Sequence, residues 1–84
     1  MINKKMTIEA LHDYLFDVWE SHYFVTINRI CFDTEKVTIA YDPEFNNIGI
    51  YNIKDNDLEN ELCSFSLKRI ETINNIRIEL DMRL

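Results

Sequence analysis

The sequence predicts an α+β domain in which an amino-terminal helix packs on a small curved antiparallel sheet of four to five strands. Apolar side chains recur at helical spacing near the amino terminus, whereas later segments alternate with a period of two, as strands do. A chain of 84 residues has room for one hydrophobic core, so residues 1–84 are predicted to form a single domain. A helix and antiparallel strands in this order are typical of two-layer α+β domains.

The helix is predicted to begin after Thr7 and to give way near Ser21, where the period changes. Its apolar side chains fall on one arc when each residue advances by about 100°. The members of this arc are Ile8, Leu11, Leu15, Val18 and Trp19. Thr7 is predicted to be the N-cap, because a threonine hydroxyl can accept a hydrogen bond from an amide of the first turn.

The segment after the helix is predicted to be one bent strand. Apolar side chains alternate over residues 23–27, and the phase then slips to Ile30 and Phe32. The slip predicts a β-bulge near residues 28–29. After a turn the register restarts, and residues 37–41 alternate cleanly with polar residues on the other face.

Two further strands are predicted in the second half of the chain. Residues 48–53 are apolar on both faces, and Gly49 marks a close backbone approach or a bend. Residues 76–84 show the strongest alternation, with one apolar and one charged face. Because this strand comes last, it is predicted to form an exposed sheet edge.

Residues 57–73 fit two interpretations. As a helix, the segment has acidic side chains early and basic side chains late, which suits the helix macrodipole. As a strand, Cys63, Phe65 and Leu67 alternate with polar residues, and the run Cys-Ser-Phe-Ser contains no strong helix former. The strand is slightly favoured and gives the order α-β-β-β-β-β, and the alternative order is α-β-β-β-α-β.

A helix followed by five short strands resembles small Sm-like and SH3-like barrels in the order of its elements. The resemblance implies a structural or adaptor module that self-associates through its sheet. The strand at residues 76–84 would then pair with its copy in a dimer or ring. Such barrels often bend their strands at glycines, whereas Gly49 is the one glycine of this chain.

The charge balance of the chain is acidic. Nine Lys and Arg stand against 15 Asp and Glu, which gives a formal net charge of −6. Direct nucleic-acid binding needs a basic surface, so this balance counts against it. No apolar signal segment or membrane span is predicted. Two cysteines are too few for the disulfide framework of a small secreted fold, so a cytoplasmic location is predicted.

No catalytic, cofactor or metal motif stands out. A single glycine cannot build a phosphate-binding loop. A zinc site could in principle use His12, His22, Cys31 and Cys63, but their spacing matches none of the short paired-ligand patterns. Cys31 and Cys63 lie in apolar runs and are predicted to be buried free thiols. We therefore expect a protein that is not an enzyme and binds neither a metal nor a cofactor.

Four carboxylates share one strip of the predicted helix: Glu9, Asp13, Asp17 and Glu20. They fall within an arc of about 80°, opposite the apolar stripe. Like charges four residues apart repel each other, and no Lys or Arg on the helix offsets them. A basic partner surface would recognise this acidic strip, with Phe16 beside it as an aromatic anchor. The alternative is a solvated face that only keeps the chain soluble.

A second acidic cluster comprises Asp55, Asp57, Glu59 and Glu61. If it lay beside the helix, the two clusters would form one extended negative surface. Such a surface could imitate a nucleic-acid backbone and occupy the basic groove of a nuclease or a nucleic-acid-binding protein. The alternative is that acids gather there as loop and helix-capping groups.

The leading hypothesis is a small binding protein that engages a basic partner, as an inhibitor or immunity protein does. Phage-encoded anti-defence proteins, anti-CRISPR inhibitors among them, are as a class often small, acidic and α+β. The competing hypothesis is the self-associating structural or adaptor module, which would form a homo-oligomer.

Overall fold

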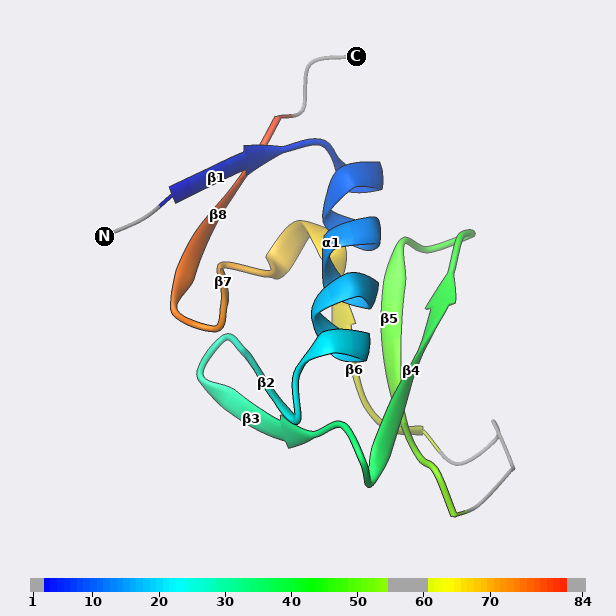
Figure 1. Ribbon diagram of the computed structural model, residues 1–84. Helices are drawn as coiled ribbons and strands as arrows, with labels where there is room; N and C mark the ends of the chain where they lie inside the picture. The colour runs from blue at the N-terminus through cyan, green and yellow to red at the C-terminus, as the bar shows by residue number, and fades with distance from the viewer. Residues whose placement is uncertain (1–2, 55–60, 82–84) are drawn as a thin grey trace.

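The computed structural model describes residues 3–54 and 61–81, in which one α-helix and eight strands form two sheets (Figure 1). The elements in chain order are β1 Asn3–Met6, α1 Ile8–Ser21, β2 Phe24–Ile27, β3 Ile30–Asp33, β4 Val37–Asp42, β5 Asn47–Asn52, β6 Glu61–Ser66, the 3-10 helix η1 Leu67–Arg69, β7 Thr72–Ile73 and β8 Ile76–Leu80. One sheet has the order β1-β8-β7-β2-β3 and the other β4-β5-β6. The α+β class is confirmed, whereas the single sheet of four to five strands is wrong.

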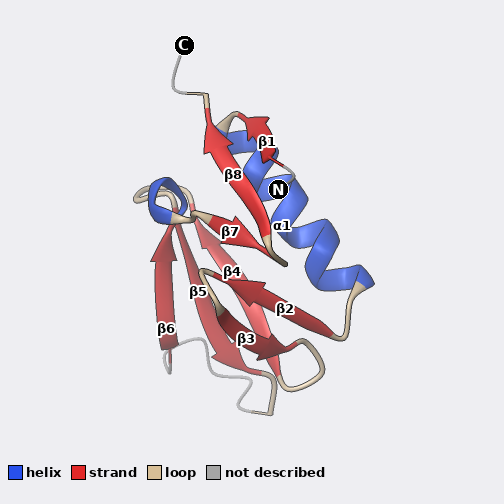
Figure 2. Cartoon of the chain, turned by 90° about the vertical axis from the view of Figure 1, so that its left-hand side faces the viewer, coloured by secondary structure: helices blue, strands red, loops and turns tan. Residues whose placement is uncertain are grey.

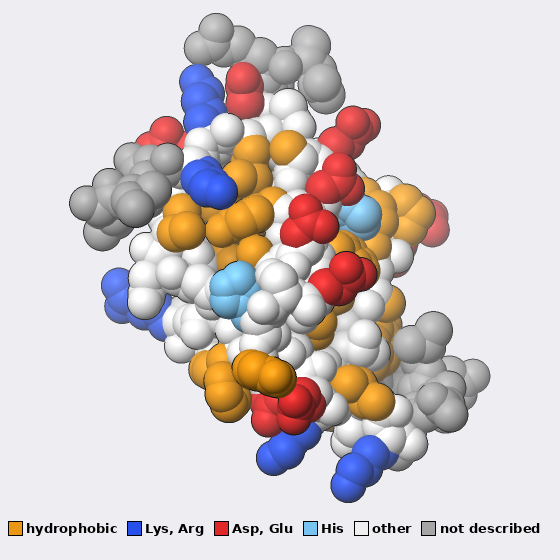
Figure 3. Space-filling model, viewed as in Figure 1, with side chains coloured by type: hydrophobic (Ala, Val, Ile, Leu, Met, Phe, Trp, Pro, Cys, Tyr) orange, Lys and Arg blue, Asp and Glu red, His pale blue; other side chains and the backbone are white. Residues whose placement is uncertain are grey.

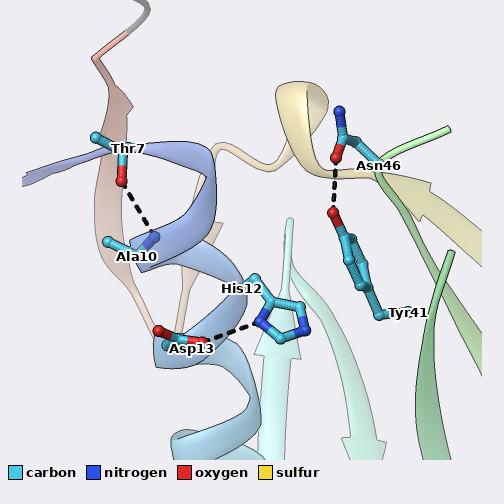
Figure 4. A network of polar contacts seen from close by, with 6 residues as sticks. All are labelled: Thr7, Ala10, His12, Asp13, Tyr41 and Asn46. Carbon is cyan, nitrogen blue, oxygen red and sulfur yellow. Dashed lines mark hydrogen bonds and ion pairs between the residues drawn. The ribbon is translucent and has the colours of Figure 1, made fainter. Parts of the chain in front are cut away.

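Helix α1 has the predicted start and the predicted buried face. The Thr7 hydroxyl oxygen accepts a hydrogen bond from the Ala10 amide at 3.2 Å, so Thr7 is the N-cap (Figure 4). At the other end, the His22 amide donates to the Val18 carbonyl oxygen at 3.1 Å. Neither helix in the described ranges has the length and apolarity needed to span a bilayer.

Replacing Thr7 by alanine is expected to lower the free energy of unfolding by about 1 kcal/mol, because the Ala10 amide loses its side-chain acceptor. Urea denaturation followed by circular dichroism measures the change. Thr7→Ser keeps a hydroxyl acceptor and serves as the control, with a loss of less than about half as much. Equal losses in the two variants would contradict the capping role.

The core lies where α1 meets the apolar faces of both sheets. In Figure 1, α1 stands between β8 on one side and β5 on the other, and Figure 2 shows the same layers from the side. The helix contributes Leu11, Leu15, Val18 and Trp19. The strands contribute Val25, Ile27, Ile39, Ile48, Ile50, Ile73 and Ile78, and Leu67 and Ile70 come from the segment between β6 and β7. The helix therefore joins the two sheets through one hydrophobic cluster.

Strand β1 precedes the helix and was not predicted. It pairs in parallel with β8, with Asn3 opposite Arg77 and Met6 opposite Leu80, so the sheet is mixed rather than antiparallel. The Lys4 ammonium lies 4.5 Å from the centre of the Tyr14 ring on α1. Because β8 lies between β1 and β7, the predicted exposed edge at residues 76–84 is wrong, and residues 82–84 lie outside the described ranges.

The predicted bulge near residues 28–29 is instead a hairpin turn. Asn28 and Arg29 both have positive φ, at 49° and 72°, and Ile27 pairs with Ile30 across them. Two consecutive positive φ values in a two-residue loop match a type I′ turn. The predicted bent strand is therefore two strands, β2 and β3. Residues 74–75, with φ of 49° and 66°, form the same kind of turn between β7 and β8.

The three-stranded sheet contains the predicted strands at residues 37–41 and 48–53, as β4 and β5. The strand interpretation is confirmed for residues 61–66, which form β6. Residues 67–73 break into η1 and the short β7, so the predicted continuous element is wrong there, and residues 57–60 lie outside the described ranges. At Gly49 a Cβ atom would approach the Tyr51 ring to 2.8 Å, so the close approach predicted at this glycine comes from a side chain.

The order of elements differs from that of the barrels that the sequence resembles. A strand precedes the helix, and the strands divide between two sheets. The order of one helix and five strands, on which the resemblance depended, is therefore wrong.

Candidate protein-binding surface

The acidic strip exists as predicted on the solvent face of α1. Its four members, Glu9, Asp13, Asp17 and Glu20, are all exposed. The side chain of Asp13 is 79% exposed. Figure 3 shows acidic side chains in a row over α1. Their sequence spacings of four, four and three residues advance about 6, 6 and 4.5 Å along the helix axis, so the carboxylates form one line along α1.

Nothing on α1 neutralises this strip with a permanent positive charge. The helix contains no Lys or Arg, and its last turn has no basic residue. Glu20 lies near the carboxyl end, where the helix dipole already concentrates negative potential. The His12 Nδ1 atom lies 3.0 Å from the Asp13 Oδ1 atom, and this is the strip's one ion pair with a described residue (Figure 4). The local field therefore favours a cationic partner.

An aromatic cluster borders the strip and ties α1 to β4. The His12 ring lies 4.7 Å from the Phe16 ring and 4.4 Å from the Tyr41 ring, between centroids. The Tyr41 hydroxyl donates to the Asn46 Oδ1 atom at 2.7 Å (Figure 4). Phe16, predicted as an aromatic anchor, is half-buried and packs against the core. A partner can therefore contact only part of its ring.

The second acidic cluster is represented by Glu61, because Asp55, Asp57 and Glu59 lie outside the described residues. Glu61 is exposed on β6, where it pairs with Tyr51. Side chains alternate along a strand, so Tyr51 and Glu61 lie on the face opposite to the buried Ile50. Helix α1 covers the buried face. The structure therefore places Glu61 and the acidic strip on opposite sides of the three-stranded sheet.

Tyr51 and Glu61 form a small polar site on this outer face. The Tyr51 hydroxyl donates to the Glu61 Oε2 atom at 3.4 Å. Desolvation raises the pKa of Tyr51 above its ordinary value of 10.0, and the negative charges of Glu61 and Asp42 raise it further. Tyr51 is therefore neutral at physiological pH and acts as a hydrogen-bond donor.

Exposed aromatic side chains lie just beyond the carboxyl end of α1. Tyr23 is 72% exposed and Phe24 is 60% exposed. Next to them is an open pocket of about 470 Å³, whose lining includes Glu20, Tyr23 and Glu35. No pattern in the sequence indicated that Glu35 would lie beside the same pocket as Glu20. This end of α1 thus combines carboxylates with aromatic surface, as interface centres do.

The two cysteines were predicted to be buried and are in fact exposed. Cys31 lies on β3 and Cys63 on β6, each the outermost strand of its sheet, and both are free thiols. Partial desolvation and the nearby Glu61 carboxylate raise the pKa of Cys63 above its ordinary value of 9.0. The reactive thiolate form of Cys63 is therefore sparsely populated at neutral pH. In the described part of the chain, no three His, Cys, Asp or Glu side chains gather as metal ligands would.

No protein-family model matches the chain, and neither a curated protein nor a solved structure matches it.

Proposed function

We propose that this protein is a small binding domain without catalytic activity, which engages a basic partner protein through the acidic strip on α1. The observation that carries the proposal is the line of four exposed carboxylates with no Lys or Arg on the helix. Repulsion within such a line costs stability, at about 0.2–0.5 kcal/mol for each pair four residues apart. A cationic partner would remove this cost on binding, and it would also be attracted by the net charge of −6.

The partner class that fits this surface best is a nuclease or another nucleic-acid-binding protein. Such proteins carry a basic groove that follows a line of phosphates. A rigid helix that presents carboxylates about 4.5–6 Å apart along its axis offers a comparable line of negative charge. The proposed role is therefore that of an inhibitor, immunity or anti-defence protein of the anti-CRISPR-like kind, which occupies the groove as a nucleic-acid mimic.

The experiment is a charge reversal within the strip. Asp13→Lys together with Asp17→Lys is expected to weaken partner binding by at least about 100-fold, because two attractive contacts become repulsive. Wild-type protein serves as bait in a pull-down from the native host, and calorimetry with the purified basic partner then gives the affinities. The mimic role further predicts that a DNA or RNA duplex displaces the protein from this partner.

A matched control separates the strip from the overall charge. Glu44→Lys together with Glu71→Lys changes the net charge by the same amount at exposed positions outside α1. This variant is expected to bind within about threefold of the wild type at physiological salt, since distant charges are screened. If both double variants lose binding equally, the affinity depends on the net charge of the protein and the strip is not the binding site. If neither loses binding, the proposal is wrong.

Self-association through a sheet edge is a second candidate function, as expected of a structural or adaptor module. The strand first assigned to this role, β8, is internal to its sheet. The outer strand β6 now takes its place, because four of its six residues have exposed side chains.

A further inference from the structure

The described residues contain four strands that each have a single strand neighbour: β1, β3, β4 and β6. Strands β1 and β3 have only four residues each. The free side of β4 is partly used by α1, because the Trp19 Nε1 atom donates to the Val37 carbonyl oxygen at 3.2 Å. Strand β6 has six residues and lies at the outer margin of the molecule in Figure 2. It is therefore the longest open edge.

The hydrogen-bond pattern shows which backbone groups of β6 point outward. The Leu67 amide donates to the Asn46 carbonyl oxygen at 2.9 Å. In an antiparallel ladder, bonded and non-bonded pairs alternate, so Ser66 and Ser64 belong to non-bonded pairs with β5. Their N–H and C=O groups therefore point away from β5. No other described residue forms a hydrogen bond with these groups.

The side chains of β6 do not protect this edge. Natural edge strands are usually blocked by lysine, proline, inward-pointing charges or a β-bulge. Residues 63–66 contain none of these, and the register shift with β5 lies at Leu62, near the start of the strand. Leu62 is 59% exposed. Cys63 lies opposite the fully buried Ile50 on the core side of the sheet, yet it is exposed because β6 is the last strand. On this face Cys63 is uncovered, whereas Phe65 packs against the Phe32 ring of β3, with the ring centroids 5.9 Å apart.

We propose that β6 pairs with β6 of a second copy of this chain, antiparallel, about a two-fold axis through Ser64. A two-fold axis perpendicular to the sheet keeps the apolar faces of both copies on the same side. Residues directly opposite each other point to the same face, and successive residues point to opposite faces. Such an axis can therefore pair only residues whose numbers add up to an even sum. Centring the axis on Ser64 places Ser64 opposite Ser64 of the second copy, where both backbones point outward. The same register places Cys63 opposite Phe65 of the second copy, and this sulfur–ring contact covers the exposed thiol.

The charges at the two ends of β6 favour a second copy of this chain over an unrelated strand as its partner. Glu61 begins β6, and Lys68 follows just beyond its carboxyl end. Antiparallel self-pairing brings the Glu61 end of each copy to the Lys68 end of the other, at both ends of the new ladder. A six-stranded sheet results, with β6 of both copies at its centre. The acidic strip lies on α1 and takes no part, so this pairing is independent of the proposed binding to a basic partner, and it specifies the self-association given above as the second candidate function.

Sedimentation equilibrium of the wild-type protein from about 1 µM to about 300 µM tests the dimer. Ser64→Pro is expected to weaken dimerisation at least about tenfold, because proline removes an N–H group that only the dimer uses. Ser64→Ala keeps this N–H group and is expected to dimerise within about twofold of the wild type. Circular dichroism confirms that both variants are folded. A wild-type monomer over the whole range would overturn the proposal.

Disulfide trapping tests the register without a proline. With Cys31→Ser and Cys63→Ser as background, Ser64→Cys places two thiols on residues whose Cα atoms are about 5.5 Å apart, within disulfide reach. Ser66→Cys in the same background is the control, because the proposed register separates its two copies by about 13 Å along the strand. Under mild oxidation we expect a covalent dimer from the Ser64→Cys variant alone. Equal trapping in both variants, or trapping in neither, would contradict the register.

Discussion

Replacing Leu15 by alanine is expected to lower the free energy of unfolding by about 2–5 kcal/mol. Leu15 is fully buried on the inner face of α1, where the helix meets the apolar faces of both sheets. The variant loses the transfer free energy of the atoms that are removed. It also leaves a cavity, because the helix and the two sheets relax only partly to fill the space. A domain of this size has about 5–10 kcal/mol in total, so the thermal midpoint should fall by at least about 10 °C.

Leu62→Ala makes the same chemical change at an exposed position on β6. It is expected to change the free energy of unfolding by less than about 0.5 kcal/mol in dilute solution. Calorimetry of both variants at equal concentration gives the comparison. Similar losses at the two positions would mean that α1 does not anchor the core.

Asn28→Ala is the second large effect, with an expected loss of about 2–4 kcal/mol. The Asn28 Oδ1 atom accepts hydrogen bonds from the amides of Glu71 at 2.7 Å and Thr72 at 3.1 Å. Its Nδ2 atom donates to the Arg69 carbonyl oxygen at 3.0 Å. The side chain thus joins the β2–β3 turn to the end of η1 and the start of β7. Alanine also disfavours the positive φ of 49°.

Two further substitutions separate these contributions. Asn28→Gly accepts the positive φ but loses all three side-chain hydrogen bonds, and Asn28→Asp keeps the two that Oδ1 accepts. Urea denaturation should rank the stabilities as wild type, then aspartate, then glycine, then alanine. If glycine were as stable as the wild type, the hydrogen bonds would contribute nothing and the conformation alone would explain the residue.

Periodicity predicts the elements whose two faces differ in polarity. The buried face of α1 and the exposure of the acidic strip follow from the same helical period, so both could be predicted. Strand β4 could be predicted from its period of two, whereas β5 is apolar on both faces and was predicted from its short apolar run. Strand β1 could not be predicted, because its Asn-Lys-Lys-Met sequence has no apolar alternation and its position depends on a distant partner, β8.

Errors at the candidate surface come from features that depend on neighbouring strands. Cys31 and Cys63 lie in apolar runs, which usually indicates burial, but each lies on an outermost strand. The turn at Asn28 and Arg29 lacks the glycine that marks most type I′ hairpins, so its phase slip resembled a bulge. The exposed edge was predicted at β8 but lies at β6, because only the sheet topology shows which strands have a neighbour on both sides.

The pairing of β1 with β8 sets the order in which the five-stranded sheet can be completed. Residues 3–6 lie opposite residues 77–80, so this ladder joins segments that nearly the whole described chain separates. During synthesis β1 leaves the ribosome before the other described elements, and it has no strand partner until β8 has been synthesised. The backbone hydrogen bonds within helix α1 and within the β4–β5 hairpin join residues that are close in sequence, so both elements can form earlier. Such a high contact order predicts slower folding than that of a helical bundle of equal length.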